Sequence, residues 1–336
     1  MTSAIFLSDR PHPPAELLDA ADAGKLVLFI GAGVSRLCGS PNWESFSHAL
    51  LRWLVQKELI NHSVKTQLAA LPVKMRLSIS LSIADNKEAL PTDGDYRAML
   101  MTKNEEERRL GYTLYRDLTA MSRYYVTTNY DEWLDLKHDE VDFSKATAAS
   151  IPIAARRELV CKPSDLTISN MEQGKVVHLH GSLTDPQSMV ITTSNYLVHY
   201  QNDQGTAQNP VTAFLFHLFQ KGGWTVLFVG YGMEEMDVLE YVLQKTHVYD
   251  EQQLSQETPA PRHYLLRGFY SHEQDLLGHL ATYYAEHCGV QLVPFSLDGK
   301  DHHQLCTVIA DWAKRIKAKP LPPLEKRLAF RNLLDS

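Results

Sequence analysis

Short runs of consecutive apolar residues recur along the chain, and they alternate with segments whose apolar positions repeat every three or four residues. The most apolar runs are 26–30 and 226–229. A continuous apolar run of this length is typical of a strand buried on both faces of a parallel sheet. Together with weaker runs of similar length, they predict strands at 25–30, 123–127, 175–179, 189–192, 225–229, 262–268 and 290–294.

Between these strands, much of the chain has apolar residues at the spacing of a helix. It predicts helices at 14–24, 43–60, close to Ser194, at 236–244 and at 301–316. Strands that alternate with helices favour a doubly wound, mostly parallel sheet covered by helices. We therefore expect a Rossmann-like α/β fold.

Residues 63–122 contain no convincing strand pattern. Their apolar spacing and the charged run at 105–109 predict a helical insertion, which would cover the edge of the sheet or form a lid. The whole domain is expected to span 14–318. The remaining tail, 319–336, is rich in proline and then amphipathic, so it either packs back on the domain or docks on a partner.

Composition and charge narrow the classes of function. The chain has 336 residues and a net charge of −7, from 33 basic and 40 acidic residues, which disfavours nucleic acid as a ligand. The four cysteines form no C-x-x-C pair, so the usual spacing of a zinc knuckle is absent. No apolar run has the length of a membrane span or a signal peptide. We expect a cytoplasmic protein with reduced thiols and no membrane partner.

The residues that directly follow the predicted strands are the best candidates for function. In doubly wound sheets, ligands bind beyond the carboxyl ends of the strands, near the point where the strand order reverses. Glycine or small polar residues follow four of the strands, at 31–35, 129–131, 180–182 and 230–232. This clustering is more informative than any single motif.

The first of these turns reads Gly31-Ala32-Gly33-Val34-Ser35. Such a turn can present backbone N–H groups to a pyrophosphate, with the positive end of a helix dipole behind them. The pattern departs from G-x-G-x-x-G, because Arg36 stands at the last glycine position. Leu51 also stands where a dehydrogenase would have an acidic residue for the ribose, so a conventional dehydrogenase is disfavoured. The alternative is a tight turn without a ligand.

Asn129 and Asp131 follow the second strand. An amide side chain can hold ribose hydroxyls or a water molecule without carrying charge. The alternative is that this Asn–Asp pair caps the next helix. For Asp131, capping or orienting a neighbour and touching a ligand are both open.

His180 ends another predicted strand, beside Gly181. A histidine at a partly open strand end suits a general base, since its ordinary pKa lies near neutrality. The alternative is a structural, hydrogen-bonded histidine, which is our interpretation of His178. The His-x-His pair has no third ligand at an obvious spacing, so no metal is expected.

Taken together, the four motifs resemble the SIR2 (sirtuin-like) family. The order matches: a Gly-Ala-Gly-x-Ser turn, then Val126-Thr-Thr-Asn-Tyr-Asp131, then Leu179-His-Gly-Ser182, and a late Gly-Tyr-Gly turn. Ser188-Met-Val-Ile-Thr-Thr-Ser-Asn-Tyr196 continues the similarity to the bacterial SIR2-like branch. The resemblance covers residues 20 to 315.

This resemblance implies NAD as the substrate, with Asn129 and His180 as the catalytic residues at the reacting ribose. The residues expected to contact the dinucleotide are Gly31, Ala32, Gly33, Ser35, Asp131, Gly230 and Tyr231. The pyrophosphate would lie on the first turn. Trp43, Phe46 or Tyr130 would line the nicotinamide pocket, although Phe46 also fits a core position.

The chain lacks the two C-x-x-C pairs of protein deacylases, and Ser40-Pro-Asn-Trp-Glu44 replaces their loop. In both respects it resembles the zinc-less NAD hydrolases of bacterial antiphage defence, which deplete NAD in infected cells. That branch implies a homo-oligomer and a partner such as a HerA-like ATPase. The alternatives are a protein deacylase or ADP-ribosyltransferase that uses the same site, and a non-catalytic module that senses NAD or ADP-ribose.

Overall fold

The computed structural model describes residues 6–138, 155–200, 209–220, 223–231, 240, 242–248 and 263–318. Its strands are β1 Leu26–Ile30, β2 Tyr124–Thr127, β3 Leu159–Val160, β4 Val176–His178, β5 Thr225–Val229, β6 His263–Phe269 and β7 Val290–Ser296. Its α-helices are α1 Ala15–Asp22, α2 Ala32–Leu37, α3 Trp43–Gln56, α4 His62–Ala69, α5 Val73–Asn86, α6 Asp93–Leu100, α7 Glu105–Met121, α8 Thr193–Tyr200, α9 Pro210–Phe219, α11 Gln274–Cys288 and α12 Gln304–Arg315.

The described strands form one sheet in the order β3-β4-β2-β1-β5-β6-β7. Every pairing is parallel. The chain first builds the sheet to one side of β1 and then crosses over to β5 on the other side. The predicted Rossmann-like fold with a parallel sheet is therefore confirmed, and the strand order reverses between β1 and β5.

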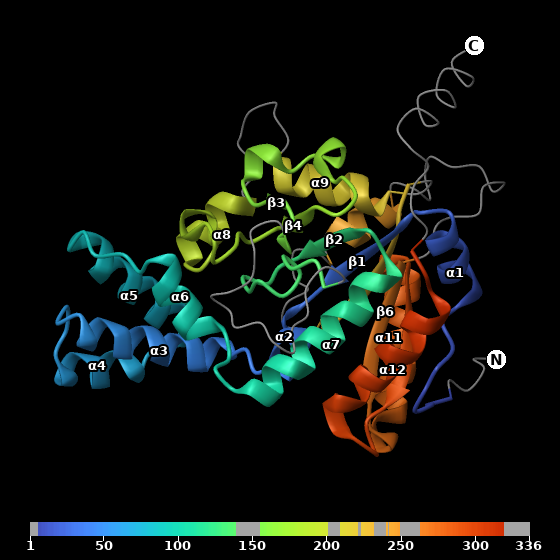
Figure 1. Cartoon of the computed structure of the whole chain (residues 1–336), viewed down its shortest axis with the longest axis horizontal. Helices are drawn as coiled ribbons and strands as arrows, with labels where there is room; N and C mark the ends of the chain where they lie inside the picture. Colours follow the sequence, from blue (N-terminus) through green and yellow to red (C-terminus); the bar gives the residue numbers. More distant parts are fainter. Residues whose placement is uncertain are drawn as a thin grey trace, which may run out of the picture.

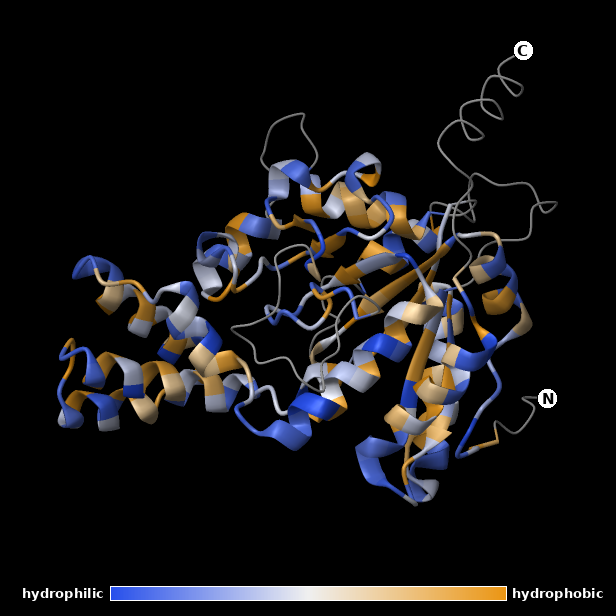
Figure 2. Cartoon of the chain, viewed as in Figure 1, coloured by the Kyte–Doolittle hydropathy of each residue, from blue (hydrophilic) through white to orange (hydrophobic). Residues whose placement is uncertain are grey.

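Apolar side chains fill both faces of this sheet, as the continuous runs predict. In β1, Val27 and Phe29 face a core that also contains α9 and α11. Leu28 and Ile30 face the opposite core, which contains α1, α7 and α12. Figure 2 shows the strands as the apolar centre of the molecule, between helices of mixed character.

A third apolar core lies in the lobe built by α3, α4, α5 and α6, which projects to one side of the sheet in Figure 1. Residues 63–122 contain no strand, so their predicted helical character is confirmed. Only part of this segment lies in the lobe, because α7 packs on the sheet beside α12. The predicted domain limits, 14–318, remain a prediction, and the tail 319–336 lies outside the described residues.

The strand predicted at 189–192 is wrong. These residues follow a 3-10 turn, Pro186–Ser188, and lead directly into α8. Met189 and Ile191 are buried in the core of the lobe, so their apolar character reflects packing against helices. The structure adds β3 at the edge of the sheet, which at two residues is too short for a sequence pattern.

Two predicted helices are partly altered. The helix predicted at 43–60 ends at Gln56, and the one predicted at 301–316 begins with a 3-10 turn before α12. Much of the helix predicted at 236–244 lies outside the described residues, although 240 and 242–244 are helical. None of the described helices has the length and apolar character needed to cross a membrane.

Candidate functional site

The four turns singled out from the sequence follow β1, β2, β4 and β5, which are neighbours in the sheet. Because all strands are parallel, these turns lie at the same edge of the sheet (Figure 1). The turns after β1 and β5 flank the point of strand reversal.

Glycines allow the turns after β1 and β5 to pack directly against each other. The N–H groups of Gly31 and Gly33 donate to the carbonyl oxygens of Val229 and Gly230, at 2.9 and 2.8 Å. A Cβ atom at either position would lie 2.7 Å from the Gly230 oxygen, so no larger residue fits. Gly230 itself has a φ of 75°, in the left-handed region that favours glycine. Of the first three residues of this turn, Ala32 alone has no acceptor for its N–H among the described residues.

Asn129 connects the loop after β2 to this turn. Its side-chain Nδ2 donates to the Gly31 oxygen at 3.1 Å and to the Ser35 Oγ at 2.8 Å. Ser35 Oγ in turn shares a hydrogen bond with the hydroxyl of Tyr115 in α7, at 2.9 Å. The amide oxygen of Asn129, Oδ1, is buried and has no protein partner in the described part of the chain. It is therefore an acceptor still available for a ligand hydroxyl or a water molecule.

No α-helix begins after Asn129, because residues 129–138 form turns and irregular backbone. The alternative in which Asn129 and Asp131 cap a helix is therefore wrong. Asp131 instead accepts a hydrogen bond from the N–H of Trp133 at 3.3 Å, within its own loop. Burial raises the pKa of the Asp131 carboxyl to about 6, against the lowering effect of Ser35.

His180 lies beyond β4, beside α8. Its Nε2 is 2.6 Å from the Tyr200 hydroxyl, and its ring is also surrounded by Tyr196 and His199. Desolvation by these neighbours lowers the pKa of His180 to about 3, and His199 adds to the effect. The imidazole is therefore neutral at physiological pH. Gly181 has a φ of 80° and passes close to the Ser188 backbone.

Tyr231 contributes mainly to the core. Its ring packs edge-on against Phe29 and Phe228, and only 5% of the residue is exposed. Its hydroxyl lies at the strand ends, 3.0 Å from the Thr128 Oγ1. Sequence reasoning did not single out Thr128, Tyr115 or Tyr200, because each acquires its place only through contacts with distant segments.

A family comparison covers three of the four strand ends. Residues 123–286 match the model of the SIR2-like domain. This segment, just under half of the chain, is similar to that domain. The match includes Asn129, Asp131, His180 and the turn after β5, whereas the turn after β1 precedes it.

The chain is also similar to a curated protein. Over 242 residues, the chain is 25% identical to the NAD(+) hydrolase ThsA of Cytobacillus dafuensis. The match covers 69% of this chain and 40% of that relative. The chain thus spans less than half the length of the curated relative it matches.

The helical lobe contacts the loops at the strand ends at several points. Tyr130 belongs to the core of the lobe and donates through its hydroxyl to the Val190 oxygen at 2.6 Å. Trp43 packs edge-on against Tyr130 and is 42% exposed, whereas Phe46 is buried. Of the three aromatic residues proposed for a nicotinamide pocket, Phe46 and Tyr130 are therefore placed in the core of the lobe, and Trp43 is the exposed one.

A buried carboxylate ties the lobe to the same loop. Glu132 accepts two hydrogen bonds from Arg97 of α6, at 2.7 and 2.9 Å, and a further one from Arg156. Burial alone would raise the pKa of Glu132, but its two arginines lower it overall. Glu132 therefore stays ionised beside a neighbour, Asp131, whose carboxyl has a raised pKa.

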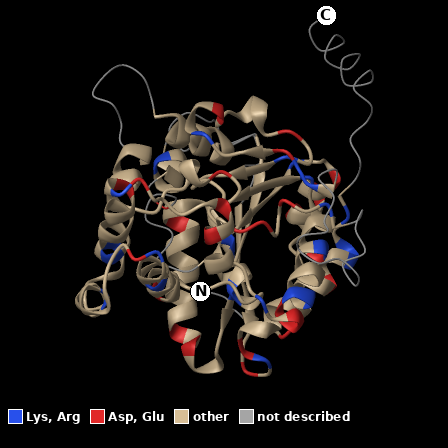
Figure 3. Ribbon diagram, turned by 60° about the vertical axis from the view of Figure 1, so that its left-hand side comes forward, with Lys and Arg blue, Asp and Glu red and all other residues tan. Residues whose placement is uncertain are grey.

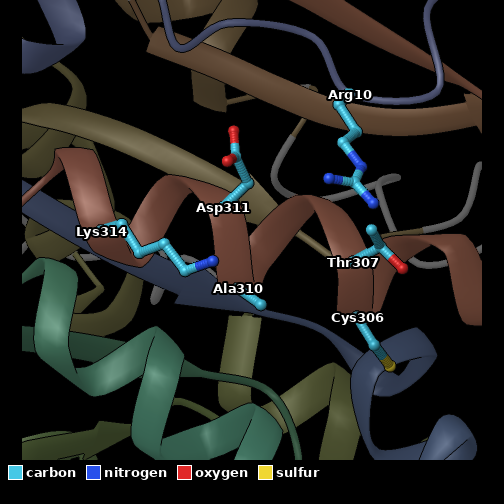
Figure 4. Close-up of a pocket in the computed structure, with 6 residues that line it drawn as sticks. All are labelled: Arg10, Cys306, Thr307, Ala310, Asp311 and Lys314. Atoms are coloured by element: carbon cyan, nitrogen blue, oxygen red, sulfur yellow. The ribbon is translucent and has the colours of Figure 1, made fainter.

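A cavity of about 320 Å³ lies elsewhere, against the outer face of α12. Figure 4 shows its lining residues, Arg10, Cys306, Thr307, Ala310, Asp311 and Lys314, and none of them belongs to the strand ends. Basic and acidic residues are interspersed along the described part of the chain (Figure 3). In the described residues, no group of three or more His, Cys, Asp or Glu side chains is arranged to hold a metal ion.

Proposed function

We propose that this chain hydrolyses NAD+ at the bond between nicotinamide and ribose, releasing nicotinamide and ADP-ribose. The observation that carries the proposal is the link between two strand ends: the Asn129 amide donates both to Gly31 and to Ser35 of the first turn. The SIR2-like domain and the similarity to an NAD(+) hydrolase support it.

The binding mode follows from the order of the strand ends. The pyrophosphate would lie on the turn after β1, where the Ala32 N–H remains available. The ribose next to nicotinamide would then lie over Asn129 and reach towards His180. The partnerless Asn129 Oδ1 would accept a hydrogen bond from a ribose hydroxyl or from the attacking water.

In the reaction, the glycosidic C–N bond breaks and its electron pair leaves with nicotinamide. The ribose carbon becomes positively charged and is captured by the oxygen of water, which gives up a proton. Asn129 would position this water or the ribose. His180 is a weak base in this structure, with a pKa of about 3, so it would accept the proton once bound substrate changes its surroundings. Because Nε2 of His180 is bonded to Tyr200 in this structure, substrate has to replace that bond before His180 can act.

The test is to incubate the chain with NAD+ and to follow nicotinamide release, for the wild type and for Asn129→Ala and His180→Ala. Both variants should lose the activity while remaining folded. Matched controls are Asn86→Ala and His302→Ala, at exposed positions away from the strand ends. Wild-type rates in both site variants would overturn the assignment.

We further propose that NAD depletion serves antiphage defence in the cytoplasm, and that the chain works as a homo-oligomer with a partner such as a HerA-like ATPase. A defence enzyme of this kind has to be inactive at rest. Nicotinamide release is therefore measured with the chain alone and with its partner. Release that requires an acylated peptide would favour a deacylase, and NAD binding without turnover in every assembly would favour a sensing module.

A further inference from the structure

Two strand histidines of this chain are buried, and their hydrogen-bond partners assign them different protonation states. His263 in β6 accepts a hydrogen bond at Nδ1 from the N–H of Val226, at 3.2 Å. Its Nε2 lies 3.0 Å from the carbonyl oxygen of Phe219, to which it donates. One ring nitrogen accepts and the other donates, so His263 is neutral.

His178 in β4 has an acceptor at both ring nitrogens. Its Nδ1 lies 2.9 Å from the carbonyl oxygen of Asn129, and its Nε2 lies 2.8 Å from the Asp135 Oδ1. A carbonyl oxygen cannot donate, so Nδ1 carries a proton. The contact with Asp135 also needs one proton, which the ring holds if the carboxylate is ionised.

The charges around His178 favour the ionised pair. The ring is fully buried, and burial by itself disfavours the imidazolium. The charge of Asp135 and its hydrogen bond raise the pKa of His178, and so do the hydrogen bond to the Asn129 carbonyl and the charge of Asp131. Together they outweigh the effect of burial, so the pKa of His178 is raised overall. The opposite charge of Asp135 offsets the burial of the imidazolium, and the other carboxylate oxygen, Oδ2, has no hydrogen-bond partner among the described residues.

The two contacts of this ring also close a loop. Asn129 and Asp135 stand near opposite ends of the segment that follows β2, which contains no helix or strand between them. Its backbone also accepts hydrogen bonds from Leu183, at the Tyr130 oxygen, and from Arg157, at the Asp135 oxygen, at 3.0 and 2.6 Å. Leu179, the next residue after His178, donates its N–H to Thr127 at 2.8 Å. The ring is thus anchored to the sheet on one side and holds both ends of the loop on the other.

We propose that His178 and Asp135 form a charged positioning pair, which fixes the backbone of Asn129 so that its amide faces the first turn and the substrate. The effect of this pair on catalysis rests on the proposed function. The protonation state and the placement of Asn129 do not depend on that function, so they are tested separately.

The first test is NMR of the full chain labelled with ¹⁵N-histidine, at pH 7.5. The His178 signals are assigned by their loss in His178→Gln. We expect both ring nitrogens of His178 to be protonated and slow to exchange with solvent, and only Nε2 of His263 to be protonated. A His178 ring with a single protonated nitrogen would overturn the proposal, and the protonation state itself is measured on the wild-type protein.

The second test is Asp135→Asn, which keeps the shape of the side chain and removes its charge. His178 should then lose the Nε2 proton and keep the Nδ1 proton. The side-chain amide signals of Asn129, assigned with Asn129→Ala, should shift or broaden. Unchanged Asn129 signals in a folded Asp135→Asn protein would contradict a positioning role.

The third test uses NAD hydrolysis. Asp135→Asn should lower kcat at least about tenfold and leave KM within about twofold, because a misplaced catalytic group slows the chemical step. The matched control is His263→Gln, which removes the other buried histidine and should leave kcat per folded molecule unchanged. An unchanged kcat in Asp135→Asn would overturn the positioning role, whereas a wild-type chain without activity both alone and with its partner would count against the proposed function alone.

Discussion

The two halves of the sheet, on either side of β1, are built differently. On one side, β6 and β7 pair over seven residues each, and the helices α11 and α12 cover them. On the other side, β2 and β4 have four and three residues, and irregular loops follow them. Those loops bury Asn129, Asp131, Glu132 and Asp135, whereas the long strands bury mainly apolar side chains.

This difference separates a scaffold from a candidate site. Buried carboxylates and amides cost free energy unless they are paired. A contribution to stability is therefore a weak explanation for their concentration in one half of the sheet. The regular half can supply the stability that the loop half lacks. The comparison predicts that substitutions in the loop half change activity most, and that substitutions in the regular half change stability most.

The largest expected effect is in the loop half. Asn129→Ala should lower nicotinamide release at least about a hundredfold. Its stability should change by about 1 kcal/mol, the usual net value of lost hydrogen bonds. Activity assays and thermal unfolding check the two values, and a variant that loses stability in step with activity would place Asn129 in the scaffold.

In the regular half, Leu265→Ala in β6 should have the reverse effect. Leu265 is 2% exposed, and the cavity left by its truncation should lower the free energy of unfolding by about 3 kcal/mol. Nicotinamide release per folded molecule should stay at the wild-type value. Urea unfolding measures the loss, and a lowered rate in the folded protein would show that the two halves are coupled.

Asp131→Asn is expected to stabilise the protein above pH 6. Burial raises the pKa of Asp131 to about 6 in the folded chain, above its unfolded value, so the folded state binds more protons in this range. Stability is therefore lost as pH rises from about 4 to 6, and Asp131→Asn should recover about 2 kcal/mol at pH 8. Unfolding of both proteins at pH 4 and 8 tests this, and a gain of equal size at both pH values would contradict it.

Removing the charge of the neighbouring carboxylate, Glu132, should lower the stability instead of raising it, and by a smaller amount. The pKa of Glu132 is lowered in the folded chain, where Arg97 and Arg156 outweigh its burial. The stabilisation that ionised Glu132 provides is therefore present above the pKa that Glu132 has in the unfolded chain. It is lost as the pH falls through the pKa of Glu132 in the folded chain. Glu132→Gln should cost about 1 kcal/mol at pH 7, because both arginines retain some exposure, and less below pH 4. A pH-independent cost would show that the pair acts through packing.

The sequence predicted the candidate site in outline because its signals are local. Glycine next to a buried strand, as at Gly31 and Gly230, needs no knowledge of the rest of the chain. The alternative in which Asn129 caps a helix was wrong, since the residues that shape this loop come from elsewhere. They are His178 from β4, Arg97 from α6 and Arg156, which follows the segment 139–154 outside the described residues. The strand expected at 189–192 was wrong for a related reason, because apolar residues are buried equally well by helices.

By itself, the sequence determined the parallel sheet, since continuous apolar runs are stable only where both faces of a strand are covered. It also determined which residues end the strands. Only the tertiary structure decided the protonation of the buried histidines and the opposite pKa shifts of Asp131 and Glu132, because these depend on which charges and acceptors lie within a few ångströms. Such distances arise from the packing of segments far apart in the chain, which a linear pattern of residues does not contain.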